Sequence, residues 1–581
     1  MVDANHKYDT YQKAGKLNFT PNMPNYEETY KSFKFEDHYN EIGWAQGKPL
    51  NAAHVAVERH ANGPNANKTA LIYVGDNNLE ERYTYKELHL LSNKFANVLK
   101  KHGIKKGDRV FLFISRVPAV YVAFLGILKA GAIASTLFGA FGPQAVKDRV
   151  GASDGVMIIT NAKLKERVDS VKAEMPALEH VIVVGAKEEM PGAISYEKEM
   201  ESSSDEFTME ETHPEDTCFM LYTSGTTGKP KGVMHAHMAI LQQHMTAKWV
   251  LDLRPEDVYW CTADHGWVTG ISYGILGPLS IGTTIILYEG RFSADAWYST
   301  LQKYKVNVWY TAPTAIRMLM KEGKEITKKY DFSSLRVIYS VGEPLNPEAI
   351  REGLDMFGLP FHDTWWQTET GAMMITNYPC MDIRFGSMGK PFPGVAAGII
   401  DDNGNELGPN EEGNLALRPG WPAMMRTIWK NQEKYDSYFK NGWYTAGDKA
   451  WRDMDGYFWF IGRADDVIKT SGERVGPFEV ESALIDHPAV AEAGVIGKPD
   501  PVRGEIIKAF ITLKKGFEPS DKLKEEIQQF VKKRMAAHAF PREIDFVQNL
   551  PKTRSGKIMR RVLKAKELGQ DVGDTSTLES D

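Results

Sequence analysis

Short apolar runs alternate with longer amphipathic stretches from about Lys68 onward. Runs long enough for one buried strand occur at Val110–Ile114, Val156–Ile159, Val181–Val184 and Thr283–Leu287. Between such runs lie stretches with apolar residues at helical spacing, for example Tyr85–Lys101. Strand-sized apolar runs that alternate with helices are typical of parallel sheets covered by helices on both faces. The pattern therefore predicts an α/β fold with doubly wound sheets.

The pattern changes towards the C-terminus. Arg384–Gly394 is rich in glycine and proline, which predicts a loop, and the shorter alternating runs after it suit a small β-barrel. Past a charged junction at Gly462–Asp466, the periodicity predicts a helix, two strands and a second helix. These four elements are expected at Phe478–Ile485, Val490–Ile496, Ile507–Leu513 and Lys522–Met535.

We therefore expect two domains. Residues 1–464 are predicted to form a large N-terminal domain of two doubly wound α/β subdomains plus a small β-barrel, and residues 465–581 a smaller α+β domain. The first fifty residues are polar and aromatic without a clear period. They are expected either to wrap on the surface as an extension or to be partly disordered.

The composition is that of a folded protein. Hydrophobic residues make up 42% and charged residues 25% of the 581 residues, as in ordinary globular proteins. The formal net charge of -6 gives no basis for general binding to nucleic acid or to an acidic membrane. Tyr121–Phe141, the most apolar long stretch, contains Lys129 and three glycines, so it predicts a buried helix followed by a strand rather than a membrane span. Three widely spaced cysteines exclude a disulfide framework, and we expect a cytoplasmic protein.

The strongest chemical signal is the segment Tyr222–His235, which reads YTSGTTGKPKGVMH. It follows an apolar strand, Cys218–Leu221, and combines three glycines, two lysines and a run of serine and threonine. Glycines let backbone amides approach an anion closely, hydroxyls add further donors, and lysines supply positive charge. The spacing differs from the Walker pattern, yet these residue types predict a loop that cradles phosphate.

This loop resembles the signature of the adenylate-forming superfamily, which contains acyl-CoA synthetases, adenylation domains of peptide synthetases and firefly-type luciferases. Further motifs follow in the order and rough spacing of its AMP-forming acetyl-CoA synthetases, and the resemblance covers nearly the whole chain. They are GWVTG at 266–270, SVGEP at 340–344, DTWWQTETG at 363–371, WYTAGD at 443–448, GRADDVIKTSG at 462–472 and PKTRSGKIMR at 551–560. The resemblance implies two half-reactions: acetate and ATP give acetyl-adenylate and pyrophosphate, and CoA then takes the acetyl group to give acetyl-CoA and AMP.

The resemblance also implies an ATP site spread over several of these motifs. Gly342, Glu343 and Pro344 would contact the adenine, and Asp448 would accept both ribose hydroxyls. Arg463 would lie near the ribose and Arg474 near the phosphates. The remaining members, from the loop and from the segment that lines the base and phosphates, are Thr223, Ser224, Gly225, Thr226, Thr227, Gly228, Lys229, Asp363, Thr364, Trp365, Trp366, Gln367 and Thr368.

For the chemical step, the resemblance implies Lys557, Thr223 and Glu369. Adenylation needs electrostatic relief more than acid–base catalysis, because an anion attacks a polyanion. The Lys557 ammonium would meet the acetate oxygen and the α-phosphate, and Glu369 would be associated with the Mg²⁺ that accompanies ATP. Acetylation of Lys557 would remove its charge, so a lysine acetyltransferase and a deacetylase are candidate partners.

The predicted acyl pocket consists of Val268, Thr269, Val341 and Trp366. In relatives that use longer acids, a small residue, commonly glycine, takes the place of Trp366 and leaves a channel. An indole at this position would close the pocket after about two carbons, since one misfitting methylene costs more than the roughly 1–3 kcal/mol that a fitting methylene contributes.

Three further predictions come from the resemblance alone. For CoA it implies Thr269 and Ser471 on the pantetheine path and Lys532 near a phosphate, with Lys533 and Arg534 as equally good candidates. Asp465 would be the hinge about which the C-terminal domain rotates between the half-reactions. His487, with the carbonyls of Ile485 and Val490, resembles an ion site of relatives.

Acetate, ATP and CoA are therefore the expected ligands, with neither nucleic acid nor membrane as a partner. The alternatives are a propionate-preferring or other short-chain acyl-CoA synthetase, an adenylation enzyme that loads a carrier protein, and a catalytically inactive adenylate sensor.

Overall fold

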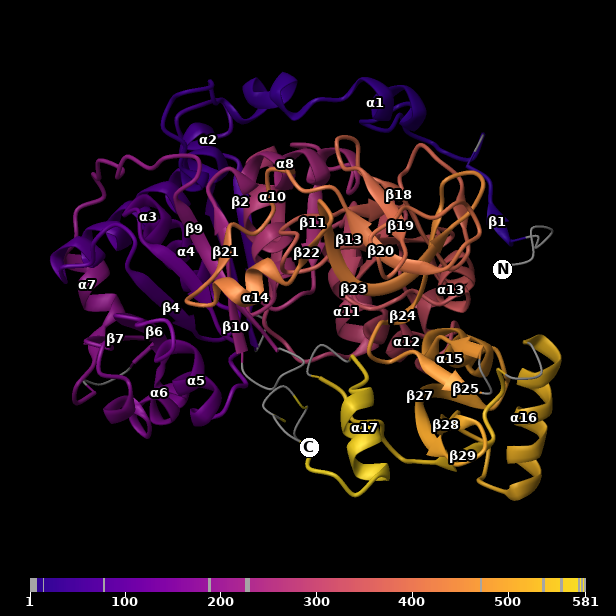
Figure 1. The fold of residues 1–581 in the computed structure, drawn as a ribbon. Helices are drawn as coiled ribbons and strands as arrows, with labels where there is room; N and C mark the ends of the chain where they lie inside the picture. Colours follow the sequence, from indigo (N-terminus) through magenta and orange to yellow (C-terminus); the bar gives the residue numbers. More distant parts are fainter. Residues whose placement is uncertain are drawn as a thin grey trace.

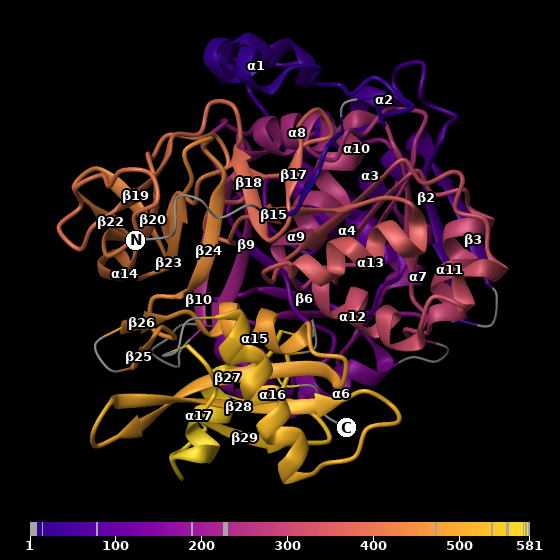
Figure 2. The same cartoon turned by 90° about the vertical axis from the view of Figure 1, so that its right-hand side faces the viewer.

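The computed structural model describes residues 8–13, 15–76, 79–186, 190–224, 230–470, 473–535, 539–553, 557–572, 575 and 578. These residues form a large N-terminal domain and a smaller C-terminal domain, which lies below the large domain in both views (Figures 1 and 2). No helix among the described residues combines the length and hydropathy that a membrane span needs.

The first sheet has the strand order β21-β10-β9-β5-β4-β6-β7-β8. Its strands are β4 (Arg109–Phe113), β5 (Ile133–Thr136), β6 (Met157–Asn161), β7 (His180–Val184), β8 (Ile194–Ser195), β9 (Thr217–Ser224), β10 (Pro230–Ala236) and β21 (Thr427–Ile428). Val110 and Leu112 pack into the core that contains α3 (Tyr85–Lys101) and α4 (Pro118–Lys129). Phe111 and Phe113 point to the opposite core, which contains α5 (Pro143–Val150) and α6 (Ala162–Asp169). The strand is buried on both faces, as a doubly wound sheet requires.

The second sheet repeats this arrangement. Its parallel strands are β2 (Thr69–Val74), β12 (Thr284–Tyr288), β11 (Val258–Cys261), β13 (Val308–Thr311), β14 (Val337–Val341) and β15 (Phe361–Trp365), and β3 (Glu80–Thr84) closes one edge. Trp309 packs with α11 (Ala294–Lys303), α12 (Pro313–Glu322) and α13 (Pro347–Phe357). Tyr310 packs on the other face with α8 (Ala239–Trp249) and α10 (Gly277–Ile281). Alternate residues thus face alternate layers.

The barrel strands continue the second sheet without a break. β15 pairs with β16 (Ile375–Thr376), β16 with β18 (Ser387–Pro391), and β18 with β24 (Phe458–Arg463). The remaining strands are β19 (Ala397–Ile400), β20 (Gly413–Leu417), β22 (Phe439–Lys440) and β23 (Trp443–Arg452).

The predicted loop at Arg384–Gly394 was wrong over its central part, because Ser387–Pro391 forms strand β18. Gly389 has a φ of 89° at a register shift, and a Cβ there would lie 2.0 Å from the Thr376 carbonyl oxygen. The glycine therefore permits a bulge and a close strand contact rather than breaking the strand.

The described residues of the C-terminal domain form one sheet, β25 (Ile468–Thr470), β26 (Glu473–Val475), β27 (Val490–Asp500), β28 (Gly504–Leu513) and β29 (Glu543–Phe546). In the same described residues, three helices accompany it: α15 (Pro477–Ile485), α16 (Asp521–Arg534) and α17 (Arg560–Glu567). The four elements expected from periodicity are confirmed as α15, β27, β28 and α16.

The N-terminal segment wraps over the large domain, which confirms that alternative for the described residues before residue 50. β1 (Thr10–Tyr11) pairs with β17 (Ile383–Arg384), and helix α1 (Tyr26–Ser32) lies on the side of the large domain opposite the C-terminal domain (Figure 2). Tyr26, Phe35 and Trp44 are buried.

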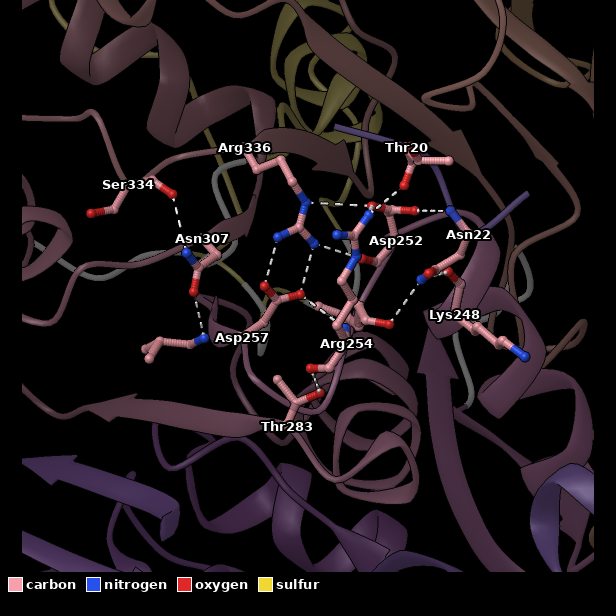
Figure 3. Close-up of polar contacts among 12 residues, drawn as sticks. Thr20, Asn22, Lys248, Asp252, Arg254, Asp257, Thr283, Asn307, Ser334 and Arg336 are labelled. Atoms are coloured by element: carbon pink, nitrogen blue, oxygen red, sulfur yellow. Dashed lines mark hydrogen bonds and ion pairs between the residues drawn. The ribbon is translucent and has the colours of Figure 1, made fainter. Parts of the chain in front are cut away.

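A charged network holds this segment against the amino ends of the second sheet (Figure 3). Arg336, directly before β14, donates from Nη1 and Nη2 to the two carboxylate oxygens of Asp257, directly before β11, at 2.6 and 2.7 Å. The backbone N–H of Asn22 donates to Asp252 Oδ1 at 2.6 Å, and Arg254 donates to the Thr20 carbonyl at 2.5 Å. Asp252 is fully buried. The network therefore links the wrapping segment to the residues that lead into two strands, β11 and β14.

Candidate active site

Two groups of the residues predicted for the site lie at the carboxyl ends of parallel strands of the second sheet. Gly342–Pro344 follow β14, and Asp363–Trp365 end β15. In open α/β sheets ligands bind at this edge. The turn after β14 needs a glycine, since Gly342 has a φ of 91°.

Asp448 lies at the centre of a cluster of donors from strands β15 and β24 and from the residues after β15. It lies on β23 directly opposite Arg463 on β24, with Arg463 Nη1 3.2 Å from Asp448 Oδ1. Trp365 Nε1 and Gln367 Nε2 donate to Asp448 Oδ2 at 3.0 and 3.2 Å. Burial raises the pKa of Asp448, and the Arg463 guanidinium opposes that rise. Gln367 is itself held by the Tyr444 hydroxyl at 2.7 Å.

Lys557 faces this cluster from the C-terminal domain. It lines a cavity between the domains together with Glu343 and Pro344 of the large domain and Arg560 of its own domain. Removal from bulk water and the Arg463 guanidinium lower the pKa of Lys557, while the Asp448 carboxylate opposes the change. The ammonium is thus within electrostatic range of Asp448 and Arg463, although Lys557 and Asp448 are 109 residues apart in sequence.

Glu369 belongs to a short chain of polar groups. The Tyr438 hydroxyl donates to Glu369 Oε1 at 2.8 Å and accepts from Lys231 Nζ at 3.0 Å. Burial and the Glu369 charge raise the pKa of Tyr438, so its hydroxyl remains a donor. These hydrogen bonds join β10, the strand after the glycine-rich loop, to the QTETG motif.

The oxygens near this chain are of the kind that Mg²⁺ prefers. Glu369 Oε2 accepts no hydrogen bond from any described residue. Thr223 Oγ1 is buried and likewise has no hydrogen-bond partner among the described residues. No group of three or more His, Cys, Asp or Glu side chains that could hold a metal occurs among the described residues. The donor set therefore fits an ion that takes most of its ligands from phosphate and water.

Trp366, which is predicted to close the acyl pocket, is fixed by its neighbours. Its Nε1 donates to the Tyr310 hydroxyl at 3.2 Å, and its ring meets Tyr273 edge-on with centroids 5.0 Å apart. Thr364 donates its only hydroxyl proton to the Ser340 carbonyl at 2.7 Å, so the Tyr310 hydroxyl must donate to Thr364. Trp366 therefore has a hydrogen-bonded position that leaves its ring little freedom to move.

The other pocket residues are also buried. Val268 and Thr269 begin the short helix α9 (Val268–Ile271), and Val341 ends β14. Val268, Val341 and Trp366 belong to one hydrophobic cluster with Tyr273 and Tyr310. An apolar wall of this kind suits a short alkyl group.

Some predicted residues lie outside the described part of the chain or apart from the cluster. Gly225, Thr226, Thr227, Gly228, Lys229 and Ser471 lie outside the described residues, and the side chains of Ser224 and Arg474 are likewise not described. The strands on either side of the loop, β9 and β10, form an antiparallel pair. Thr368 lies just before Glu369, and its carbonyl accepts the Gly371 N–H at 3.2 Å.

Lys532 and His487 are not brought to the cluster. Lys532 is exposed in the last turn of α16, with Nζ 5.3 Å from the Phe540 ring centroid, and no α16 residue lines the interdomain cavity. His487 Nδ1 accepts the Ala489 N–H at 3.2 Å, just after Ile485 and before Val490. Their roles in CoA and ion binding stay predictions.

Several residues that hold the site together were not predicted from the sequence. Tyr273 and Tyr310 fix Trp366, and Tyr438 holds Glu369, yet each lies outside a motif. Arg317 donates from Nη2 to Glu343 Oε2 at 2.6 Å and thereby fixes the loop after β14. Only Lys231 had a sequence signal, as the second lysine of the glycine-rich segment.

Family profiles match both domains. The profile described as AMP-binding enzyme matches residues 57–429, and the one described as AMP-binding enzyme C-terminal domain matches residues 479–557.

Relatives are similar over nearly the full length. The chain is 57% identical over 561 residues to the acetyl-coenzyme A synthetase of Bacillus subtilis (strain 168), covering 96% of this chain and 98% of the relative. It is 44% identical over 564 residues to that of Methanothrix thermoacetophila, covering 92% and 86%. Among solved structures, an anthranilate CoA ligase in complex with anthranoyl-AMP gives a TM-score of 0.83 at 32% identity, covering 93% and 99%. A Brucella canis acyl-CoA synthetase gives 0.75 at 37% identity, covering 94% and 99%.

Proposed function

This chain belongs to the AMP-binding enzyme family, and from that premise we propose that it is an AMP-forming acetate–CoA ligase. Two curated relatives named acetyl-coenzyme A synthetase, which match at 57% and 44% identity, support the reaction. The observation that carries the choice of acid is the fixed indole of Trp366.

In the first half-reaction an acetate oxygen attacks the α-phosphorus of ATP. The bond from that phosphorus to the bridging oxygen breaks, and pyrophosphate leaves with the electron pair. Lys557 supplies positive charge between the acetate oxygen and the α-phosphate, where two anions meet. Its place in the interdomain cavity, facing Asp448 and Arg463, supports this role.

ATP is held at three points in this proposal. Asp448 accepts the ribose hydroxyls, with Arg463 beside them, and the loop that contains Glu343 contacts the adenine. Thr223 and the glycine-rich segment bind the phosphates, with Arg474 nearby. When Mg²⁺ is bound, it neutralises phosphate charge during the transfer, and Glu369 with the neighbouring Thr223 hydroxyl would hold it.

In the second half-reaction the CoA sulfur attacks the acyl carbon, loses its proton, and displaces AMP. We assign Thr269, Ser471 and Lys532 to CoA. Because α16 lies away from the interdomain cavity in this arrangement, Lys532 could serve only after a rotation of residues 465–581 against residues 1–464.

Asp465 is the proposed hinge. Its N–H makes no backbone hydrogen bond to the described residues, whereas those of Ala464 and Asp466 are bonded at 2.9 and 3.0 Å. Asp465→Pro fixes φ near -65° without removing such a bond, so it should slow the two half-reactions unequally. Equal loss of both, with a lower melting temperature, would indicate misfolding instead.

The size of the acyl pocket is tested with a series of acids. AMP formation that depends on both CoA and acid is measured for straight-chain acids of one to six carbons. We expect acetate to give the highest kcat/KM, propionate a lower value, and butyrate almost none. A higher value for propionate would make the enzyme a propionate–CoA ligase, and AMP formation without CoA dependence would exclude a CoA ligase.

Lys557 is also proposed as the point of control in the cytoplasm. Its side chain keeps an exposed surface that an acetyltransferase could reach, and acetylation removes the charge that adenylation needs. Acetylated enzyme should lose acetate-dependent exchange of pyrophosphate into ATP and regain it after treatment with a deacetylase.

A further inference from the structure

Lys557 lies in one of two short stretches, residues 551–553 and 557–559, that are joined by backbone hydrogen bonds and are called the paired segment below. The N–H of Thr553 donates to the Lys557 carbonyl at 2.8 Å, and the N–H of Met559 donates to the Pro551 carbonyl at 2.8 Å. The N–H of Lys557 donates to Thr553 Oγ1 at 3.1 Å. The direction of Lys557 therefore depends on where the paired segment is attached.

The paired segment is attached to two glutamates of the same domain. Directly after residues 557–559, Arg560 donates to Glu481 through Nε at 2.8 Å and Nη2 at 2.5 Å, one bond to each carboxylate oxygen. Glu481 lies on α15, is buried, and also accepts the N–H of Val495 at 2.9 Å. Within residues 551–553, Lys552 donates to both oxygens of Glu492 at 2.6 and 2.7 Å.

The Arg560–Glu481 pair has the geometry of an orienting contact. A bidentate pair fixes the guanidinium plane as well as its position. A buried ion pair contributes little net stability over an apolar replacement, so stability alone does not explain it. Arg560 Nη1 also lies 3.6 Å from Asp466, the residue after the proposed hinge.

We propose that Arg560 and Glu481 are positioning residues, which hold the paired segment so that Lys557 points at the reacting phosphate. The proposal rests on the proposed function, since it assigns an orientation to the lysine of that reaction. Because Arg560 is three residues from Lys557, a displacement of Arg560 should also displace the Lys557 ammonium. A displacement of about 1 Å can cost on the order of 100-fold in rate.

The charge of Arg560 by itself would disfavour the charged form of Lys557, which is the form that adenylation needs. Its guanidinium is one of the cations that lower the pKa of Lys557. If charge were its only role, removing it would favour charged Lys557 and sustain activity at alkaline pH. A positioning role instead predicts a loss of activity at every pH. The dependence of activity on pH therefore separates the two roles.

The test measures acetate-dependent exchange of pyrophosphate into ATP in the full-length enzyme. Arg560→Met and Glu481→Gln should lower kcat by about 10- to 100-fold, with the KM for ATP within about twofold and Arg560→Lys partly restored. Thioester formation from supplied acetyl-adenylate and CoA should be unchanged. Lys564→Met is the matched control, because Lys564 lies on the same helix and pairs with Glu505 at 3.1 Å. It should exchange like wild type.

A paired variant guards against misfolding. Glu481→Leu with Arg560→Met removes both charges, so its melting temperature should return towards wild type while exchange stays low. Wild-type exchange in this variant would overturn the proposal, as would an equal loss of thioester formation. In a Lys557→Ala background, Arg560→Met should add no further loss. Wild-type exchange in Lys557→Ala alone would instead refute the proposed function.

Discussion

The two ends of the parallel strands in the second sheet carry charged residues in contrasting arrangements. At the amino ends, Arg336 holds both oxygens of Asp257 at 2.6 and 2.7 Å, and Asp252 is tied to the wrapping segment. At the carboxyl ends, Asp363 is buried, and no ion pair among the described residues includes it. Asp448 has one arginine at 3.2 Å and Oδ1 without a hydrogen bond.

At the amino ends, the charged residues bind other residues of this chain. At the carboxyl ends, the acidic residues keep capacity to bind a ligand. An acid matched by a bidentate arginine has little capacity left for another partner. A buried acid with spare acceptor capacity is unfavourable until a donor reaches it, and the ribose hydroxyls are such donors in the proposed reaction. Changes at the amino ends should therefore affect folding, and changes at the carboxyl ends should affect the reaction.

The largest effect is expected at the amino ends. Arg336→Leu leaves the buried Asp257 without its cation and Asp252 with Arg254 alone, so the free energy of unfolding should fall by about 3–5 kcal/mol. Urea denaturation measures this, and activity at a permissive temperature should remain. As a control, Lys324→Leu breaks an exposed pair at 2.7 Å and should cost under about 1 kcal/mol. An Arg336 variant with normal stability and low activity would contradict the assignment of the amino ends to folding.

Lys557→Ala should have the largest effect on the reaction at the carboxyl ends. Loss of one preorganised cation should reduce acetyl-adenylate formation by about 10²–10³-fold. Stability should stay close to wild type, because Lys557 lines a cavity and keeps an exposed surface. Exchange of pyrophosphate measures the first half-reaction, and supplied acetyl-adenylate with CoA should still give acetyl-CoA.

Trp366→Gly should change the range of acids. Without the indole, butyrate and longer acids should become substrates, while kcat/KM for acetate falls by roughly 10- to 100-fold because the methyl group loses its wall. The acid series measures both changes, and a melting curve checks the stability cost of the cavity. Continued rejection of every acid beyond propionate would show that Trp366 does not limit the pocket.

A further prediction concerns the pH dependence of stability. Burial raises the pKa of Asp363 to about 7, while its unfolded value is 3.8. The folded state therefore binds more protons than the unfolded state between these values, so this group lowers stability as pH rises from about 4 to 7. Asp363→Asn should show a shallower decline of the unfolding free energy over that window. Parallel curves for the variant and wild type would contradict the assignment.

Local pattern predicted much of the fold. Tyr85–Lys101 was predicted as a helix and forms α3 with the same ends, because Thr84 and Glu87 make a capping box that the sequence contains. The strand at Ser387–Pro391 was missed, since its glycine serves a close contact with Thr376 that only the folded chain creates.

The candidate site divides in the same way. Lys557, Glu369 and Asp448 lie in motifs with a recognisable sequence. Tyr273 and Tyr310 act on Trp366 from positions 93 and 56 residues away, so no local spacing reveals them. The amino-end network is equally hidden, because Asn22 and Asp252 are 230 residues apart.

The hydrogen bonding that runs from β15 through β16 and β18 to β24 has a mechanical consequence. In the proposed rotation about Asp465, the C-terminal domain would move against a sheet that is continuous across the large domain, so the barrel should stay fixed relative to that sheet. Spin labels on β20 and α11 should then keep a constant separation through the catalytic cycle. A label on α16 should change its distance to both of these labels.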